Sequence, residues 1–179
     1  MGESAREVWL AHGASGSALT IAPWVTGLGQ RGVTGHAVPA AGKLPLRAER
    51  AMQLYREQLA GRQDVVIGGV SYGGRVASMI AAEDPLAGLV LLSYPLHPPG
   101  KQDQQRVAHL ASIHCPVLFM SGEADPFAQL ELLRAAVRRL AQAELVTYPR
   151  TGHGLSRNPT VMADCLDRIA AFARQTAAA

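Results

Sequence analysis

The stretch that decides the fold is DVVIGGVSYGGRVASMIAAEDP, residues 64–85. An apolar run typical of a buried strand leads into a glycine-rich turn with one serine, and helix-favouring, alanine-rich sequence follows at once. The turn has the pattern Gly-x-Ser-x-Gly, with Ser71 between Gly69 and Gly73. Glycines at these two positions let a strand and a helix approach each other without Cβ clashes. The stretch therefore predicts a sharp turn that projects the Ser71 hydroxyl from the end of a strand.

Short apolar runs alternate with helix-like segments along the rest of the chain. The expected strands cover residues 7–12, 33–39, 64–70, 86–93, 115–122 and 143–149, and the expected helices cover 17–30, 47–60, 72–83, 128–141 and 159–173. The central strands are continuous runs of Val, Ile and Leu, as is typical of strands buried on both faces. This pattern predicts a three-layer α/β fold with a mainly parallel sheet of about six strands. The alanine-rich tail, residues 174–179, is expected to fray.

The composition favours a single domain over residues 1–179. A chain of 179 residues that is 48% hydrophobic has the size of one domain with one real core. Its formal net charge is +3, and the basic residues are scattered. The one local cluster, Arg134, Arg138 and Arg139, has the spacing of a solvated helix face. We therefore expect no nucleic-acid partner.

The cysteines and the N-terminus indicate where the protein resides. Cys115 and Cys165 are far apart and form neither a Cys-x-x-Cys pattern nor a metal-type cluster, which favours reduced thiols in a cytoplasmic protein. The N-terminal residues lack the basic and then apolar order of a signal peptide. No apolar run is long enough to cross a bilayer. We expect a cytoplasmic protein without a membrane partner or a metal site; the sequence predicts no oligomeric state.

A serine hydroxyl is a weak nucleophile until a base removes its proton, so Ser71 needs partners. A carboxylate is expected after a later strand, where the sequence has Asp125 and, close by, Glu123. A histidine is expected after the last strand, where His153 stands between two glycines. Asp125 lies deeper in its turn, which Pro126 fixes, and is therefore favoured over Glu123 as the group that orients His153. The order Ser71, Asp125, His153 is the order found in α/β-hydrolases.

Attack by Ser71 on a carbonyl would also require donors for the developing oxyanion. The backbone N–H of Tyr72 stands at the N-terminus of the predicted helix, where the helix dipole favours negative charge. A second N–H is expected from the loop after the first strand, from Ala14 or from Ser15. His12, in the same loop, is expected to be structural. This chemistry implies neither a metal nor an organic cofactor.

The segment SYPLHPPGKQDQQ, residues 93–105, is predicted to be a loop, because its prolines and glycine exclude a helix or a central strand. It follows a strand at the edge where doubly wound sheets bind ligands. His97 in this loop is a candidate substrate contact, with loop architecture as the alternative. Ser15 is a second candidate contact.

The chain resembles α/β-hydrolase-fold proteins over nearly its whole length. More narrowly, it is similar to the small, lidless, dienelactone-hydrolase-like group, which includes the KANL3/Tex30-type hydrolase-like proteins. The narrower resemblance is carried by LAHGASG, GGVSYGGRVAS, MSGEADPF, TGHGL and the most group-specific segment, YPLHPPGK. The resemblance implies Ser71 as nucleophile, Asp125 as acid and His153 as base, with no lid domain. Dienelactone hydrolase itself uses a cysteine at the position of Ser71, which argues against dienelactone as the substrate.

These features together predict a serine hydrolase that acts on a small-molecule acyl substrate. Ester, thioester, lactone and small amide all pass through the same tetrahedral chemistry, so the sequence does not choose among them. The alternative is a non-catalytic hydrolase-fold protein-interaction module, because the resemblance includes proteins that work as subunits of larger assemblies. A purely structural role gives no reason to keep Ser71 in a crowded turn, which favours the enzyme.

Overall fold

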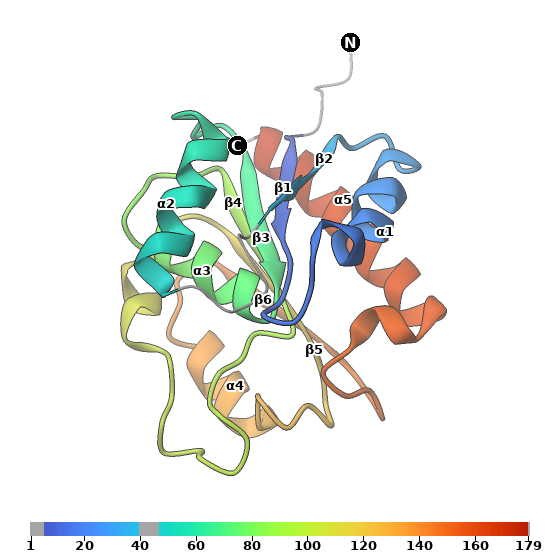
Figure 1. Ribbon diagram of the computed structural model, residues 1–179. Coiled ribbons are helices and arrows are strands. Elements are labelled where there is room, and N and C mark those ends of the chain that lie inside the picture. Colours follow the sequence, from blue (N-terminus) through green and yellow to red (C-terminus); the bar gives the residue numbers. More distant parts are fainter. Residues whose placement is uncertain (1–5, 40–46, 179) are drawn as a thin grey trace.

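The computed structural model describes residues 6–39 and 47–178, and these residues form a six-stranded sheet with helices on both faces (Figure 1). Its strands are β1 (Val8–Ala11), β2 (Gly35–Val38), β3 (Val66–Val70), β4 (Gly88–Leu92), β5 (Val117–Gly122) and β6 (Ala143–Tyr148). They are ordered β2-β1-β3-β4-β5-β6, and each neighbouring pair is parallel. The predicted α/β class and the parallel sheet of about six strands are confirmed.

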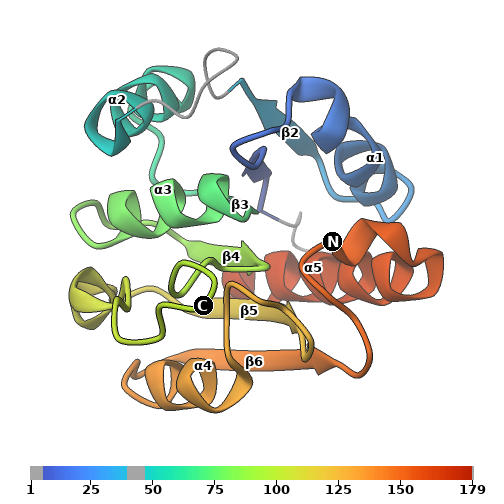
Figure 2. The same cartoon turned by 60° about the horizontal axis from the view of Figure 1, so that its bottom comes forward.

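Two groups of helices cover the two faces of this sheet (Figure 2). On one face, α1 (Ala18–Gly29) and α5 (Pro159–Ala178) lie side by side. The other face carries α2 (Ala48–Leu59), α3 (Tyr72–Ala81), α4 (Leu130–Val137) and the 3-10 helix η1 (Ala108–Ser112). Along β4, Leu89 and Leu91 pack against the second group, whereas Val90 and Leu92 pack against the first. Burial on both faces explains why the central strands are apolar without alternation.

The buried side chain of Tyr55 attaches α2 to the sheet. Its hydroxyl donates to the Trp9 carbonyl at 2.6 Å and accepts from the Gly68 N–H at 3.1 Å. Burial raises the pKa of Tyr55 far above its usual value, so the phenol stays neutral. The contact holds the strand that leads to Ser71 at a fixed position beneath α2.

The tail does not behave as expected. Helix α5 continues to Ala178, and Thr176 is buried within the stretch that the sequence predicts to fray. The methyl group of Thr176 lies 3.2 Å from the position of a Cβ added at Gly88, so the absence of a side chain on β4 makes room for the end of α5. The prediction is wrong up to residue 178, and residue 179 lies outside the described part of the chain.

Within residues 6–39 and 47–178, no helix is both long enough and apolar enough to cross a membrane. The prediction that the chain lacks a signal peptide rests partly on residues 1–5, and these residues lie outside the described ranges.

Because the strands are parallel, their carboxyl ends meet at one edge of the sheet. The ladder continues one residue beyond two central strands: the Ser71 N–H donates to the Leu92 carbonyl at 2.8 Å, and the Ser93 N–H donates to the Met120 carbonyl at 2.8 Å. Ser71 and Ser93 are thereby fixed to the edge where ligand sites of doubly wound sheets lie.

The start of α3 packs tightly against the end of β1. A Cβ added at Gly73 would lie 2.5 Å from the Ala11 carbonyl oxygen and 2.6 Å from that of His12. Both distances are too short for a real Cβ, and both partners are backbone atoms that cannot turn away. Glycine at position 73 is therefore required by the distance between strand and helix.

Gly73→Ala tests this requirement. We expect the free energy of unfolding, measured by urea denaturation, to fall by about 2 kcal/mol or more, because β1 and α3 must move apart. Gly29→Ala is the matched control: a Cβ at Gly29 meets nothing within 4 Å, so this variant should be neutral or up to about 1 kcal/mol more stable. Equal losses in the two variants would contradict the tight contact.

Candidate active site

Ser71 stands at the turn between β3 and α3 in a strained backbone conformation. Its φ is +51° and its ψ −117°, a region that residues with a side chain avoid. A Cβ added at Gly69 would lie 2.6 Å from the Ala11 carbonyl oxygen and 2.6 Å from the carbonyl carbon of Gly73. The turn can be this tight only because residues 69 and 73 have no side chains. The sharp strand-to-helix turn expected from the sequence is present.

His153 connects Ser71 with Asp125. Its Nε2 lies 2.8 Å from Ser71 Oγ, and its Nδ1 lies 2.8 Å from Asp125 Oδ2. A carboxylate accepts the Nδ1–H, so the tautomer that this pairing fixes leaves Nε2 to accept the hydroxyl proton of Ser71. The three residues come from the loops after β3, β5 and β6, and the structure brings all three together.

Asp125 is the most enclosed member of this group. Its side chain is 0% exposed, whereas that of His153 is 28% exposed. The second carboxylate oxygen, Oδ1, accepts the Phe127 N–H at 2.8 Å. The Phe127 ring also lies against the His153 ring, with 4.5 Å between the two centroids. Phe127 therefore fixes both partners of this pair. The sequence did not predict this role, because its only signal is the run DPF, residues 125–127, after a strand.

Glu123, the alternative acid, is engaged elsewhere. Its carboxylate accepts a hydrogen bond from the Thr147 hydroxyl at 2.8 Å. The backbone of the same segment joins the loops after β5 and β6: the Glu123 N–H donates to the Tyr148 carbonyl at 3.0 Å, and the Ala124 N–H donates to the Thr151 carbonyl at 2.9 Å. The geometry thus favours Asp125 as the partner of His153 and explains how the two loops are held together.

The loop after β1 lies beside Ser71. A turn from Gly13 to Gly16 is closed by the Gly16 N–H, which donates to the Gly13 carbonyl at 3.0 Å, and Ala14 and Ser15 are exposed at its tip. A Cβ added at Gly13 would lie 3.5 Å from Ser71 Cβ, which is ordinary packing distance.

Two neighbours complete this picture of the loop after β1. His12 is buried, and its Nδ1 lies 2.7 Å from the Gly13 carbonyl oxygen, as expected for a structural residue. Tyr72 is the first residue of α3, where backbone N–H groups point out of the helix N-terminus. The structure therefore places the candidate oxyanion donors on the two segments that adjoin Ser71.

His97 is placed as a support of the proline-rich loop. Its side chain is buried; Nδ1–H donates to the Pro98 carbonyl at 2.9 Å, and Nε2 accepts the Gln129 N–H at 3.0 Å. Both ring nitrogens are thus used by backbone groups, and the ring links the loop to the start of α4. This arrangement favours loop architecture over a substrate contact.

Ser93 is a second strained serine at the same edge of the sheet. It has a φ of +50°, and its Oγ is buried without a hydrogen-bond partner in the part of the chain that the structure describes. Nothing in its sequence context predicted this, because no glycine flanks it.

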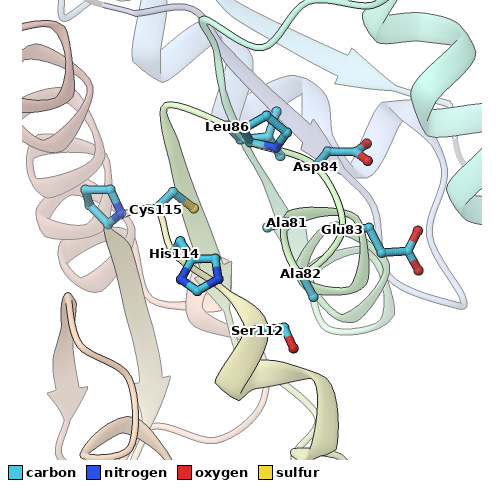
Figure 3. A pocket seen from close by; sticks show the side chains of 10 residues that line it. Ala81, Ala82, Glu83, Asp84, Leu86, Ser112, His114 and Cys115 are labelled. Atoms are coloured by element: carbon cyan, nitrogen blue, oxygen red, sulfur yellow. The ribbon is translucent and has the colours of Figure 1, made fainter.

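The described residues contain no group of three or more His, Cys, Asp or Glu side chains that could hold a metal ion. Cys115 and Cys165 are both free, and burial raises the pKa of each thiol to about 11, so both are protonated at neutral pH. Cys115 lines a hollow with His114, Glu83 and Asp84 (Figure 3). This hollow lies where β4 and β5 begin, at the edge opposite Ser71, and is separate from the candidate active site.

Comparison with known proteins identifies a family and a set of similar structures. A protein-family model described as an alpha/beta hydrolase domain matches residues 39–179. A monoacylglycerol lipase from Paleococcus ferrophilus has a TM-score of 0.77 at 17% identity, covering 94% of this chain and 94% of that one. A predicted CIB-like hydrolase from Thermoplasma acidophilum has a TM-score of 0.74 at 18% identity, covering 98% and 89%. The esterase domain of a Rhodothermus marinus protein has a TM-score of 0.73 at 15% identity, covering 95% and 87%. At these identities the likeness shows a shared fold.

Ser71→Gly and Ser71→Ala test the strain at the turn. Both variants remove the hydroxyl, but only glycine adopts this φ and ψ without strain. We expect the free energy of unfolding of Ser71→Gly to be about 1 kcal/mol higher than that of Ser71→Ala. Urea denaturation of the two proteins under the same conditions measures this difference. A Ser71→Ala protein as stable as Ser71→Gly would show that the backbone at this position is relaxed.

Proposed function

The chain belongs to the alpha/beta hydrolase domain family, and from that premise we propose that it is a serine hydrolase acting on a carboxylic ester or a related acyl substrate. One observation carries the proposal: His153 makes two 2.8 Å hydrogen bonds, one with Ser71 Oγ and one with Asp125 Oδ2. Neighbours in fold that are described as lipases or as an esterase domain support an acyl substrate.

In the proposed reaction, His153 Nε2 takes the hydroxyl proton as Ser71 Oγ attacks the substrate carbonyl. Asp125 accepts the Nδ1–H throughout, which keeps the ring in the required orientation and stabilises the imidazolium that forms. His153 then gives its proton to the leaving group, and an acyl-serine remains. A water molecule deprotonated by His153 attacks this ester, the bond between Ser71 Oγ and the acyl carbon breaks, His153 returns the proton to Oγ, and the carboxylic acid leaves.

The negative charge that develops on the carbonyl oxygen needs donors that are already in place. We assign this role to the N–H groups of Tyr72 and Ala14, with Ser15 as the alternative to Ala14. Loss of one such donor typically costs about 2.7–4 kcal/mol of transition-state stabilisation. The loop after β1 therefore contributes to the rate to an extent comparable with the residues that transfer protons.

The substrate is proposed to be a small molecule. No inserted domain covers the carboxyl edge of the sheet within residues 6–39 and 47–178, and the side chain of His153 is partly exposed. The resemblance to the dienelactone-hydrolase-like group belongs to this proposal as well, with the difference that Ser71 replaces the cysteine of dienelactone hydrolase. The proposed location is cytoplasmic, consistent with two free thiols.

Labelling with a fluorophosphonate tests the nucleophile directly. We expect intact-mass analysis to find one adduct on the wild-type protein and none on Ser71→Ala or His153→Ala, because only an activated serine reacts. Ser112→Ala is the control, since Ser112 is an exposed serine at the opposite edge and its loss should leave labelling unchanged. A well-folded wild-type protein without an adduct would instead support a non-catalytic interaction module, and a search for a binding partner would follow.

Asp125→Asn and Glu123→Gln separate the two candidate acids. Asparagine at 125 would favour the wrong tautomer of His153, so we expect kcat/KM on a 4-nitrophenyl ester to fall by about 10³- to 10⁴-fold. Glu123→Gln removes the same charge two residues away and should change kcat/KM by no more than about threefold. Comparable losses in both variants would refute the assignment of Asp125.

A further inference from the structure

Arg75 has an unusual environment for an arginine. It lies one turn along α3 from Ser71, and its N–H donates to the Ser71 carbonyl at 3.0 Å. Its side chain is half-buried, and its Nε–H is buried without a hydrogen-bond partner among the described residues. The other half-buried arginines of the described chain all donate from their guanidinium groups: Arg6, Arg31, Arg56, Arg62 and Arg106. A buried donor without an acceptor costs about 1–3 kcal/mol, and more if it is charged, so an acceptor from outside the chain would stabilise Arg75.

Arg106 brings a second positive charge to the same place. The 2.8 Å contact between Ser78 Oγ and His109 Nε2 holds the segment that follows Arg106 against α3, which carries Arg75. Burial and, after it, the charge of Arg75 lower the pKa of Arg106. Arg106 donates to the Pro95 carbonyl at 3.3 Å. No carboxylate of the described residues forms an ion pair with Arg75 or Arg106, in contrast to Arg56, which pairs with Asp84. Two cations without a counter-ion repel each other, and an anion between them would remove this repulsion.

Neighbouring residues hold the two arginines in place. The Tyr94 hydroxyl donates to the Arg106 carbonyl at 2.7 Å, and the Ser78 hydroxyl donates to the Arg75 carbonyl at 2.7 Å. Ser78 Oγ also lies 2.8 Å from His109 Nε2. Burial and the charge of Arg75 lower the pKa of His109, so this ring is neutral at pH 7 and adds no third charge. A site whose frame is fixed in advance loses little entropy when it binds.

The arginines lie beside the candidate active site. Arg75 belongs to the first turn of α3, which begins directly after Ser71 at the carboxyl edge of the sheet. Tyr94 and Pro95, which hold Arg106, follow β4 at the same edge, and the last residue of β4, Leu92, accepts the Ser71 N–H. Arg75 and the residues that hold Arg106 therefore belong to segments that start at the edge of the sheet where Ser71 lies.

We propose that Arg75 and Arg106 form a subsite for a negatively charged group of the acyl substrate. This group is a carboxylate or a phosphate and lies at some distance from the reactive carbonyl. The planar guanidinium fork binds both of these groups in a bidentate manner. The preferred substrates are thus esters with a terminal negative charge. The link to catalysis rests on the proposed serine hydrolase, whereas binding of the anion itself does not.

The first experiment measures anion binding without turnover. Glutarate and inorganic phosphate are titrated separately into the protein by isothermal titration calorimetry at low ionic strength, where exposed charges are least screened. We expect saturable binding of at least one anion, weakened about tenfold or more in Arg75→Gln and in Arg106→Gln. The better ligand distinguishes a carboxylate from a phosphate. Arg138→Gln is the matched control, because Arg138 is exposed on α4's far end and its loss changes the net charge equally.

Two results of this titration would overturn the subsite. One is a folded wild-type protein that binds neither anion. The other is binding that is unchanged in both Arg75→Gln and Arg106→Gln. The use of two variants keeps the test decisive if one of them fails to fold, which circular dichroism of each protein reports.

The second experiment measures selectivity. The substrates are mono-4-nitrophenyl glutarate and 4-nitrophenyl valerate, its neutral counterpart of equal acyl length. We expect the ratio of kcat/KM for the glutarate to kcat/KM for the valerate to fall about tenfold in Arg75→Gln and to stay constant in Arg138→Gln. If both esters are hydrolysed with a ratio that Arg75→Gln does not alter, the subsite is wrong and the hydrolase stands. If the anions bind as expected but neither ester is hydrolysed, the hydrolase is wrong and the oxyanion site stands.

Discussion

The site depends on the close approach of two backbones where the end of β1 meets the start of α3. The Ala11 carbonyl oxygen lies where the side chains of residues 69 and 73 would be, so both positions must be glycine. This contact forces Ser71, between them, into a left-handed conformation and turns its hydroxyl toward the edge of the sheet. The loop of Gly13 continues directly from β1, and the same contact therefore brings that loop against Ser71. Ser71 and the candidate oxyanion donors are positioned by one packing constraint.

The features that the sequence predicted correctly are those that depend on local patterns. The Gly-x-Ser-x-Gly run specifies its own turn, because its glycines act within five residues of each other. Continuous Val, Ile and Leu runs specify buried parallel strands, and parallel strands bring their carboxyl ends together. Together with the partners that an activated serine needs, this rule led us to expect Ser71, Asp125 and His153 to meet, and His153 hydrogen-bonds with both of the others. Their catalytic roles remain a prediction.

The features that the sequence did not predict depend on contacts between distant segments. The tail of α5 is ordered because Gly88, on β4, leaves space for Thr176, and no property of the tail itself contains that information. Phe127 supports His153 only once the loops after β5 and β6 have come together. Arg75 Nε is buried without a hydrogen-bond partner among residues 6–39 and 47–178, which can be recognised only when all neighbouring segments are in place.

The edge position of β6 divides the site into halves of unequal local stability. β6 hydrogen-bonds to one strand, β5, and carries the loop of His153, whereas β3 lies between β1 and β4 and carries Ser71. Edge segments open locally at a lower free energy than central strands, without unfolding of the whole molecule. Because the Ala124 N–H donates to the Thr151 carbonyl, such an opening would displace Asp125 and His153 together. On heating, the hydrogen bond between His153 and Ser71 would thus be lost while the centre of the sheet stayed folded.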